Sequence, residues 1–129
     1  MGFYRVWNGN DGESHMEQVD PTDYPEFAIF TNNLSGTDPL ADSNRVNAEV
    51  SINMFDGKRD MDFHPAPNEP PGQRLIIHLS GEVEIGTSDG NKHIFRAGDV
   101  RLMEDTTDPG HTHLDLSPSN AFHVLLPVL

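Results

Sequence analysis

The clearest periodic pattern in the chain is an alternation of apolar and polar residues over residues 46–55. Val46, Ala48, Val50, Ile52 and Met54 alternate with Asn, Glu and Ser side chains, which is the period of a β-strand with one buried face. We interpret the apolar face as core and the polar face as solvated. In the alternative interpretation the polar face lines a pocket, and Glu49 is then a candidate acid or base.

The second half of the chain repeats short apolar segments separated by turn signals such as Gly81, Asp89-Gly90 and Gly98-Asp99. Turn signals at roughly 8–12-residue spacing are typical of a sandwich or a closed barrel. The predicted strands are residues 75–79, 83–87, 93–95, 100–104, 111–116 and 121–128, the last two joined by a turn at residues 117–120.

The first half is less regular. Residues 3–7 form a predicted edge strand and residues 27–31 a short strand, whereas residues 32–44 and the proline-rich residues 58–72 are predicted to be irregular or loop. No long helical period is present. We therefore expect one all-β domain over residues 1–129, with an N-terminal strand and loop at 1–25 and the barrel at 46–128.

Composition narrows the function classes. The 129 residues include eleven Gly and ten Pro, which suits a turn-rich β-fold, and no Cys, so a metal would need His and carboxylate or amide ligands. The net charge of −13 predicts neither a nucleic-acid partner nor a membrane partner. No apolar run of about 18 residues is present, so we expect a cytoplasmic protein.

Several short motifs occur along the chain in the order that is typical of one known superfamily. Gly98-Asp99 follows a predicted strand and leads to Gly110-His111, while His64 precedes a strand that ends near Gly81. This pattern resembles the cupin superfamily, and in particular a subgroup of small, mostly uncharacterised single-domain cupins of the RmlC-like type. The resemblance implies a cupin-type jelly-roll β-barrel, or double-stranded β-helix, with a pocket between its sheets. The matching segments are DGESHM at 11–16, FHPAP at 63–67, EDTT at 104–107 and GH at 110–111.

The departures from the superfamily pattern concern the metal ligands. Ala66 stands where a second histidine is expected, and Arg74 stands where the superfamily has its glutamate. Only His64 and His111 carry over from the matched positions. The usual site of three histidines and one glutamate therefore cannot be assembled from them.

Strand parity suggests a different cluster. Arg74, Ile76 and His78 share one face, and the resemblance marks that face as the barrel interior, near His64 and His111. In one interpretation these three histidines bind a single divalent ion such as Fe, Ni, Mn or Zn. In the other there is no metal, and the imidazoles hydrogen-bond to one another, to Arg74 and to water.

The positive charge of Arg74 disfavours binding of a metal cation in the pocket. It favours binding of an anionic group, which a guanidinium can hold through two parallel hydrogen bonds. The alternative is that Arg74 pairs with Glu49 or Glu104 and braces two strands. Glu104 and Asp105 lie at the expected rim of the cavity, and in one interpretation a partly desolvated carboxyl group there acts as a general base. We favour the other interpretation, in which residues 105–107 form a local turn. His15, His93 and His123 are interpreted as surface or satisfied core histidines. Further predicted substrate contacts are Phe63, Gln73, Glu104 and His113.

The leading hypothesis is an enzyme with its active site inside the barrel, acting on a small polar or anionic metabolite. It would perform non-oxidative acid–base chemistry of the dehydratase, isomerase or cyclase type, through His64, Arg74, His78 and His111. One alternative is a metal-dependent oxygenase or lyase that uses the three histidines as ligands, and another is a non-catalytic small-molecule-binding protein. The N-terminal strand either mediates a homodimer or completes its own sheet.

Overall fold

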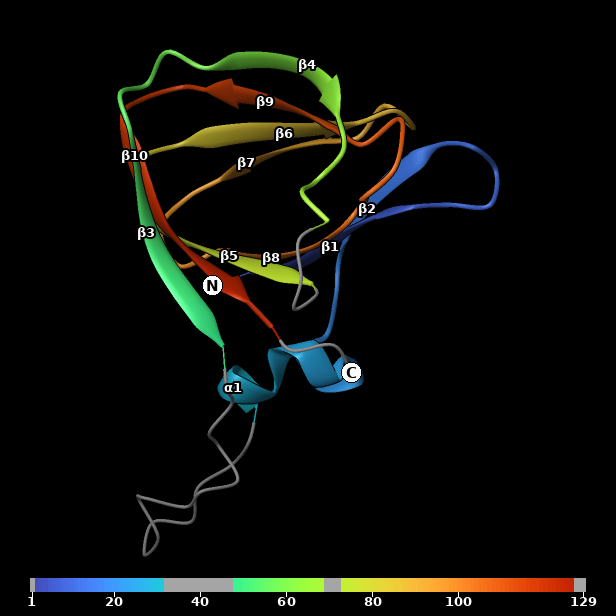
Figure 1. The fold of residues 1–129 in the computed structure, drawn as a ribbon, viewed down its shortest axis with the longest axis horizontal. Coiled ribbons are helices and arrows are strands. Elements are labelled where there is room, and N and C mark those ends of the chain that lie inside the picture. Colours follow the sequence, from blue (N-terminus) through green and yellow to red (C-terminus); the bar gives the residue numbers. More distant parts are fainter. Residues whose placement is uncertain (1, 32–47, 69–72, 127–129) are drawn as a thin grey trace, which may run out of the picture.

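The computed structural model describes residues 2–31, 48–68 and 73–126, which form two β-sheets facing each other (Figure 1). The larger sheet has the strand order β2-β1-β8-β5-β10-β3, and the smaller sheet has the order β4-β9-β6-β7. The strands are β1 Phe3–Asn8, β2 Ser14–Gln18, β3 Glu49–Phe55, β4 Asp60–His64, β5 Arg74–Ser80, β6 Val83–Thr87, β7 Lys92–Phe95, β8 Val100–Glu104, β9 His111–Asp115 and β10 Ser119–Leu125.

The chain crosses repeatedly from one sheet to the other. Strand β5 lies in the larger sheet, β6 and β7 lie in the smaller one, and β8, β9 and β10 then alternate between the two. Most neighbours are antiparallel, although β1 pairs in parallel with β8. This arrangement confirms the predicted all-β jelly-roll fold. Among the described residues, no helix has the length and apolar character needed to span a membrane.

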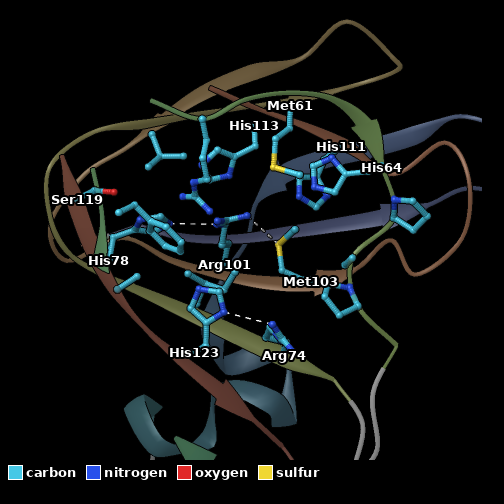
Figure 2. A pocket seen from close by; sticks show the side chains of 18 residues that line it. Met61, His64, Arg74, His78, Arg101, Met103, His111, His113, Ser119 and His123 are labelled. Carbon is cyan, nitrogen blue, oxygen red and sulfur yellow. Dashed lines mark hydrogen bonds between the residues drawn. The ribbon is translucent and has the colours of Figure 1, made fainter. Parts of the chain in front are cut away.

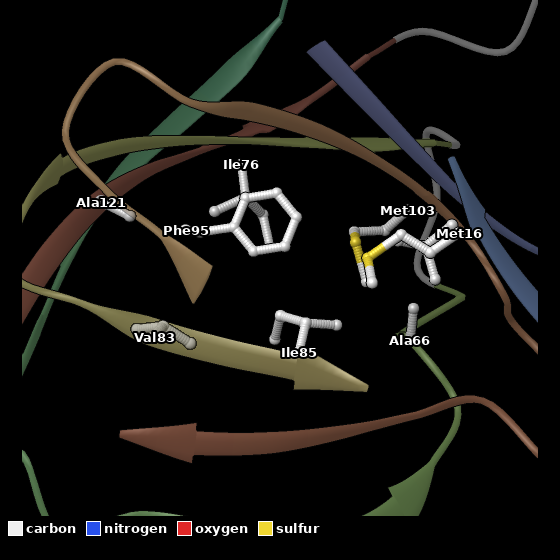
Figure 3. Packing of buried hydrophobic residues seen from close by; sticks show 9 residues of the cluster. Met16, Ala66, Ile76, Val83, Ile85, Phe95, Met103 and Ala121 are labelled. Carbon is white, nitrogen blue, oxygen red and sulfur yellow. The ribbon is translucent and has the colours of Figure 1, made fainter. Parts of the chain in front are cut away.

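Apolar residues pack on both faces of the larger sheet because its strands alternate in side-chain direction. One cluster lies between the sheets and includes Ile85, Phe95 and Met103 (Figure 3). A second cluster lies on the opposite face, where Leu75 and Leu102 pack with Phe27. The short helical segments that supply Phe27 cover this outer face: η1 Pro21–Asp23, η2 Pro25–Phe27 and α1 Ala28–Thr31.

Three local predictions were wrong. Residues 27–31 are helical and do not form a strand. Pro25 begins a helical turn, the helix continues over Ala28–Thr31, and this turn buries the Phe27 side chain. Strands β2 and β4 lie in segments predicted to be loops. Strand β1 pairs with β2 on one side and with β8 on the other, so it is an internal strand of its sheet. It therefore offers no free edge at which a second copy of the chain could pair. A homodimer stays a prediction.

The polar face of β3 points toward the space between the sheets, which corrects our interpretation of this strand. Ser51 and Asn53 lie opposite His123 and Ala121 of β10, two residues that line the cavity described below. The apolar face is turned outward, with Val50 and Ile52 each 59% exposed and Met54 78% exposed. Alternation gave the strand correctly, but it carried no information on which face is covered.

Candidate active site: a cationic cavity between the sheets

A cavity of about 260 Å³ lies between the two sheets (Figure 2). No Asp or Glu is among the described residues that line it. The lining is therefore rich in hydrogen-bond donors and in positive charge. It comprises His64, His78, His111, His113 and His123, the three arginines Arg59, Arg74 and Arg101, and Phe55, Met61, Pro65, Ala66, Pro67, Ile76, Val83, Met103, Ser119 and Ala121.

The alternation of strand side chains brings these residues together. Arg74, Ile76 and His78 of β5 all line the cavity, as the parity of the strand predicted. The neighbouring strand β8 contributes Arg101 and Met103, while Val100, Leu102 and Glu104 point to the other face. Strands β9 and β10 supply the remaining histidines of the described lining except His64, which ends β4.

Arg101 is the most unusual of these residues, because its guanidinium is buried with the side chain only 3% exposed. Its Nε donates to Nε2 of His78 at 3.1 Å, and its Nη1 donates to Sδ of Met103 at 3.4 Å. Burial lowers the pKa of Arg101 to about 9, so the group remains charged at neutral pH. Its two bonded partners are a neutral ring and a thioether, which supply no negative charge, and the charge of Asp105 offsets only part of the effect of burial on the pKa.

His78 is held as a neutral acceptor. Its Nε2 receives the Arg101 N–H, so the ring proton resides on Nδ1, and the ring stacks on Phe95 with centroids 5.2 Å apart. Burial, reinforced by the positive charge of Arg101, lowers the pKa of His78 to about 2. His78 is therefore suited to orienting the guanidinium, and poorly suited to carrying a proton during a reaction.

His111 forms a buried dyad with Asp105. Its Nδ1 donates to Oδ2 of Asp105 at 2.6 Å, which leaves Nε2 as the ring nitrogen that can accept a proton. Burial lowers the pKa of His111, and Asp105 opposes that effect. The prediction that Asp105 serves a local turn was wrong: its carboxylate is fully buried behind His111.

His64 lies beside His111, with ring centroids 4.5 Å apart. Its Nδ1 donates to the carbonyl oxygen of Asp62 at 2.8 Å, so Nε2 is again the available nitrogen. Gly110 makes this approach possible because it adopts a φ of +72°, and a Cβ atom there would overlap the carbonyl oxygen of His64. The Gly110-His111 motif thus has a steric origin.

His113 and Arg59 share one carboxylate. His113 Nε2 donates to Oδ1 of Asp115 at 2.7 Å, and the Arg59 guanidinium donates to both Asp115 oxygens at 3.2 Å. Burial lowers the pKa of His113 to about 4, although Asp115 acts in the opposite direction. Asp115 therefore neutralises Arg59, and this trio is a structural support at one wall of the cavity.

Arg74 contacts His123, its Nη1 lying 3.3 Å from Nδ1 of the ring. Burial, followed by the charge of Arg101, lowers the pKa of His123 to about 4. Glu104 was one predicted partner of Arg74, but it accepts hydrogen bonds from Arg5 at 2.6 Å and from Gln73 at 3.2 Å.

The eight residues predicted for the site divide into two groups. His64, Arg74, His78, His111 and His113 line the cavity, and three others do not. Glu104 projects from the opposite face of β8, where Gln73 binds it, and the Phe63 side chain is 46% exposed. The substrate-binding roles of Gln73, Glu104 and Phe63 stay predictions without support from the cavity geometry.

The three histidines predicted as metal ligands do not fit a metal ion. Within the described ranges, no group of three His, Cys, Asp or Glu side chains is placed to hold one. The lone pair of His78 Nε2 is used by Arg101, and the guanidinium would repel a cation at that position. The donor set of His64, His78 and His111 is thus incompatible with a shared ion.

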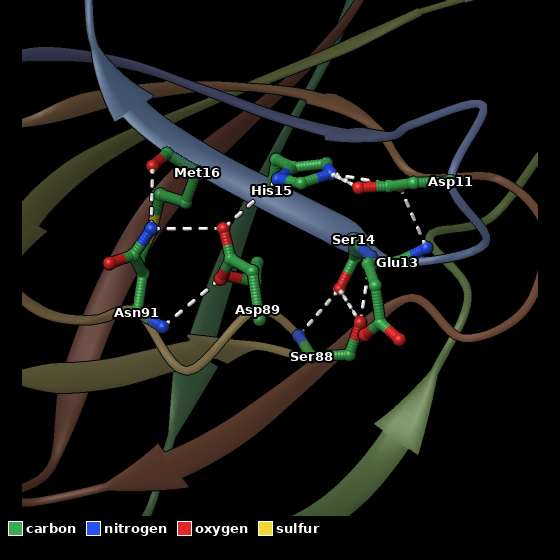
Figure 4. Close-up of polar contacts among 9 residues, drawn as sticks. Asp11, Glu13, Ser14, His15, Met16, Ser88, Asp89 and Asn91 are labelled. Atoms are coloured by element: carbon green, nitrogen blue, oxygen red, sulfur yellow. Dashed lines mark hydrogen bonds and ion pairs between the residues drawn. The ribbon is translucent and has the colours of Figure 1, made fainter.

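His15, from the DGESHM segment, lies in β2 outside this cavity (Figure 4). Its Nε2 contacts both oxygens of Asp11, at 2.9 and 3.0 Å, and its Nδ1 contacts Oδ2 of Asp89 at 3.1 Å. The hydrogen bond with Asp11 raises the pKa of His15, and Asp89 adds to the effect. This cluster ties β2 to the turn between β6 and β7.

Sequence reasoning missed Arg101, Arg59 and His123. A signal for Arg101 was present, because Val100 and Leu102 define one face of a five-residue strand and place Arg101 on the other. Arg59 precedes β4, in a segment predicted to be loop, and so had no strand parity to follow. The parity of His123 in the last strand was ambiguous because both of its neighbours are apolar.

The fold and cavity define an all-β, two-sheet protein with a cationic site between its sheets. Neither a scan of protein-family models nor a search of curated proteins found a match. Solved structures similar to this chain include an RmlC-like cupin protein from Desulfovibrio desulfuricans, at 16% identity and a TM-score of 0.47, covering 66% of this chain and 76% of that one.

Two further similar structures come from other bacteria. A conserved protein of unknown function from Streptococcus pyogenes has 19% identity and a TM-score of 0.46, covering 66% of this chain and 68% of that one. A protein from Neisseria meningitidis has 10% identity and a TM-score of 0.44, covering 84% and 99%. Because all three TM-scores are below 0.5, the fold assignment rests on the strand order and register of this chain.

Proposed function

We propose that this protein is an enzyme that binds a small organic anion in the cavity and acts on it by non-oxidative acid–base chemistry. The observation that carries the proposal is the buried guanidinium of Arg101, bonded to an imidazole and a thioether. Burying a charge is costly unless an opposite charge accompanies it. Asp105 offsets part of this cost through space without a hydrogen bond to Arg101. A carboxylate or another anionic group of a ligand would supply a direct partner, in a bidentate geometry if it meets the guanidinium edge.

His111 is the best candidate for the group that moves a proton. It is held by Asp105 in the tautomer with Nε2 unprotonated, and that arrangement also stabilises the imidazolium once it forms. His78 lacks this capacity because its Nε2 already accepts from Arg101. His64, beside His111, is placed to share or orient the proton.

The proposed step is removal of a proton from a carbon next to a carboxylate or carbonyl group. His111 Nε2 takes the proton, and the C–H electron pair moves into the adjacent carbon–oxygen system as an enolate. The negative charge that builds on oxygen is stabilised by Arg101 and Arg74. Return of the proton at another carbon gives an isomerisation. If the proton held by His111 is instead delivered to a β-hydroxyl, the C–O bond breaks, water leaves, and the enolate electron pair forms the C=C bond of a dehydration product.

Ligand binding tests the first half of the proposal. We expect short mono- and dicarboxylates to raise the melting temperature, and Arg101→Met and Arg74→Gln each to abolish that increase. Arg96→Met is the control, because Arg96 is an exposed arginine whose partner is Glu82 at 3.0 Å. Equal binding of anions by wild type and Arg101→Met would overturn the proposal.

Hydrogen–deuterium exchange at carbon tests the chemistry without a known product. Candidate acids are incubated with the protein in D₂O, and loss of their C–H signals is followed by NMR. We expect His111→Asn and Asp105→Asn to slow the exchange by at least about 100-fold, the usual scale of general-base catalysis. Tight binding with no exchange for any bound acid would instead favour the non-catalytic binding protein.

A further inference from the structure

The cationic cavity adjoins a second, more open chamber of about 390 Å³. Arg74 and His123 line both spaces, so they form the boundary between them. Beyond this boundary the lining changes in character, because β3 contributes an acid, a hydroxyl and an amide. The described lining of the open chamber comprises Glu49, Val50, Ser51, Asn53, Arg74, His123 and Leu125.

The strand registers place these groups in rows across the larger sheet. Arg101 lies opposite Ile76, Ile76 lies opposite His123, and His123 lies opposite Ser51. Residues directly opposite in neighbouring antiparallel strands project from the same face of a sheet. This row therefore runs along the inner face from a guanidinium on β8 to a hydroxyl on β3.

A second row shows the same change of charge. Arg74 lies opposite Leu125, and Leu125 lies opposite Glu49. Along both rows, positive charge on β8 and β5 gives way to hydrogen-bond acceptors on β3. Glu49 carries a carboxylate, which accepts hydrogen bonds and attracts a cation when ionised.

We infer that the ligand of this site has two functional ends: an anionic group bound by Arg101 and Arg74, and a tail that ends in a hydrogen-bond donor at β3, either an ammonium bound by Glu49 or a hydroxyl bound by Asn53. The inference rests on the proposed function, since it takes the anionic end from there. Adjacent strands are about 4.8 Å apart, so the backbones of β5 and β3 are about 10 Å apart. Because the Arg74 side chain lines the open chamber together with residues of β3, the ligand has to span only the part of this separation that the Arg74 side chain leaves, for which we take a chain of roughly five or six atoms.

A matched set of acids tests the inference. The probes are pentanoate, its ω-hydroxy analogue and its ω-amino analogue, with dissociation constants measured by calorimetry. We expect at least one tailed acid to bind about two- to tenfold more tightly than pentanoate, the gain that a net hydrogen bond provides. Glu49→Gln should remove this gain for an ammonium tail, measured as the ratio of its affinity to that of pentanoate in the same variant, and Asn53→Ala should reduce the corresponding ratio for a hydroxyl tail.

The control is Glu17→Gln, which makes the same change at an exposed position on β2, the opposite edge of the larger sheet. Equal affinities for all three acids, with no effect of Glu49→Gln or Asn53→Ala, would overturn the two-ended ligand and leave the anion site standing. If no acid binds, or if Arg101→Met binds each acid as well as wild type does, the proposed function fails and this inference fails with it.

Discussion

Replacing Arg101 by methionine should stabilise the ligand-free protein while it abolishes anion binding. Burial lowers the pKa of Arg101 from 12.5 to about 9. Since one pKa unit corresponds to about 1.4 kcal/mol, the folded protein holds this cation at a cost on the order of 4–5 kcal/mol. Methionine keeps most of the apolar stem and carries no charge, but it loses the hydrogen bonds to His78 and Met103, which are worth about 1–3 kcal/mol together.

The net expectation is a free energy of unfolding higher by about 1–3 kcal/mol, in line with other replacements of buried charges by apolar residues. For a domain of this size, the melting temperature should rise by roughly 3–10 °C. A residue that lowers the stability of the fold but is required for ligand binding serves function and not structure.

Urea and thermal unfolding at pH 7 are suitable assays, in a buffer without phosphate, citrate or other carboxylates. This choice matters because a bound anion would stabilise wild type selectively. Arg96→Met should change the free energy of unfolding by less than about 0.5 kcal/mol, as is usual for an exposed position. A loss of more than 1 kcal/mol in Arg101→Met under these conditions would refute the reasoning, because Arg101 would then be a structural residue whose charge the fold already satisfies.

Three further predictions follow from single positions. Gly110→Ala should lower the free energy of unfolding in urea by at least about 3 kcal/mol, because the new Cβ would clash with the backbone of His64 and the positive φ disfavours alanine. Gly90→Ala is the control: its φ is +92° but the space around it is open, so the loss should be only about 1 kcal/mol. His123 has a pKa of about 4 in the folded protein and 6.5 in the unfolded chain, so the unfolded chain takes up the proton first as the pH falls. His123→Asn should therefore reduce the free energy of unfolding that is lost between pH 7 and pH 5 by about 1–2 kcal/mol. An unchanged pH dependence of stability would contradict this. His15 has a raised pKa in the folded protein, so its stabilisation of the folded state is present below pH 6.5 and is lost as the pH rises through the folded-state pKa. His15→Asn should therefore make the free energy of unfolding less dependent on pH in that range. A steeper pH dependence would argue against the ion pairs of His15 with Asp11 and Asp89.

The sequence predicted the class of the fold and five of the cavity residues because both depend on short-range alternation. Residues 74–78 are an example: the parity of β5 placed Arg74, Ile76 and His78 on one face without reference to any other strand. The parity of β3 was equally clear, yet the covered face depends on the partner β10 and on the position of β3 at the sheet edge. Such information lies in long-range pairing, which alternation within one segment does not contain.

The distribution of charge explains how this protein can select an anion despite its net charge of −13. The long-range field of the molecule repels anions, so electrostatic steering does not favour their capture. Inside the cavity, burial keeps His78, His113 and His123 neutral at pH 7, and Asp115 neutralises Arg59. The attraction for a ligand is therefore concentrated at the buried guanidinium of Arg101, where the low local dielectric strengthens it. An anion that reaches this point is selected by its fit to the guanidinium of Arg101 and to the cavity around it.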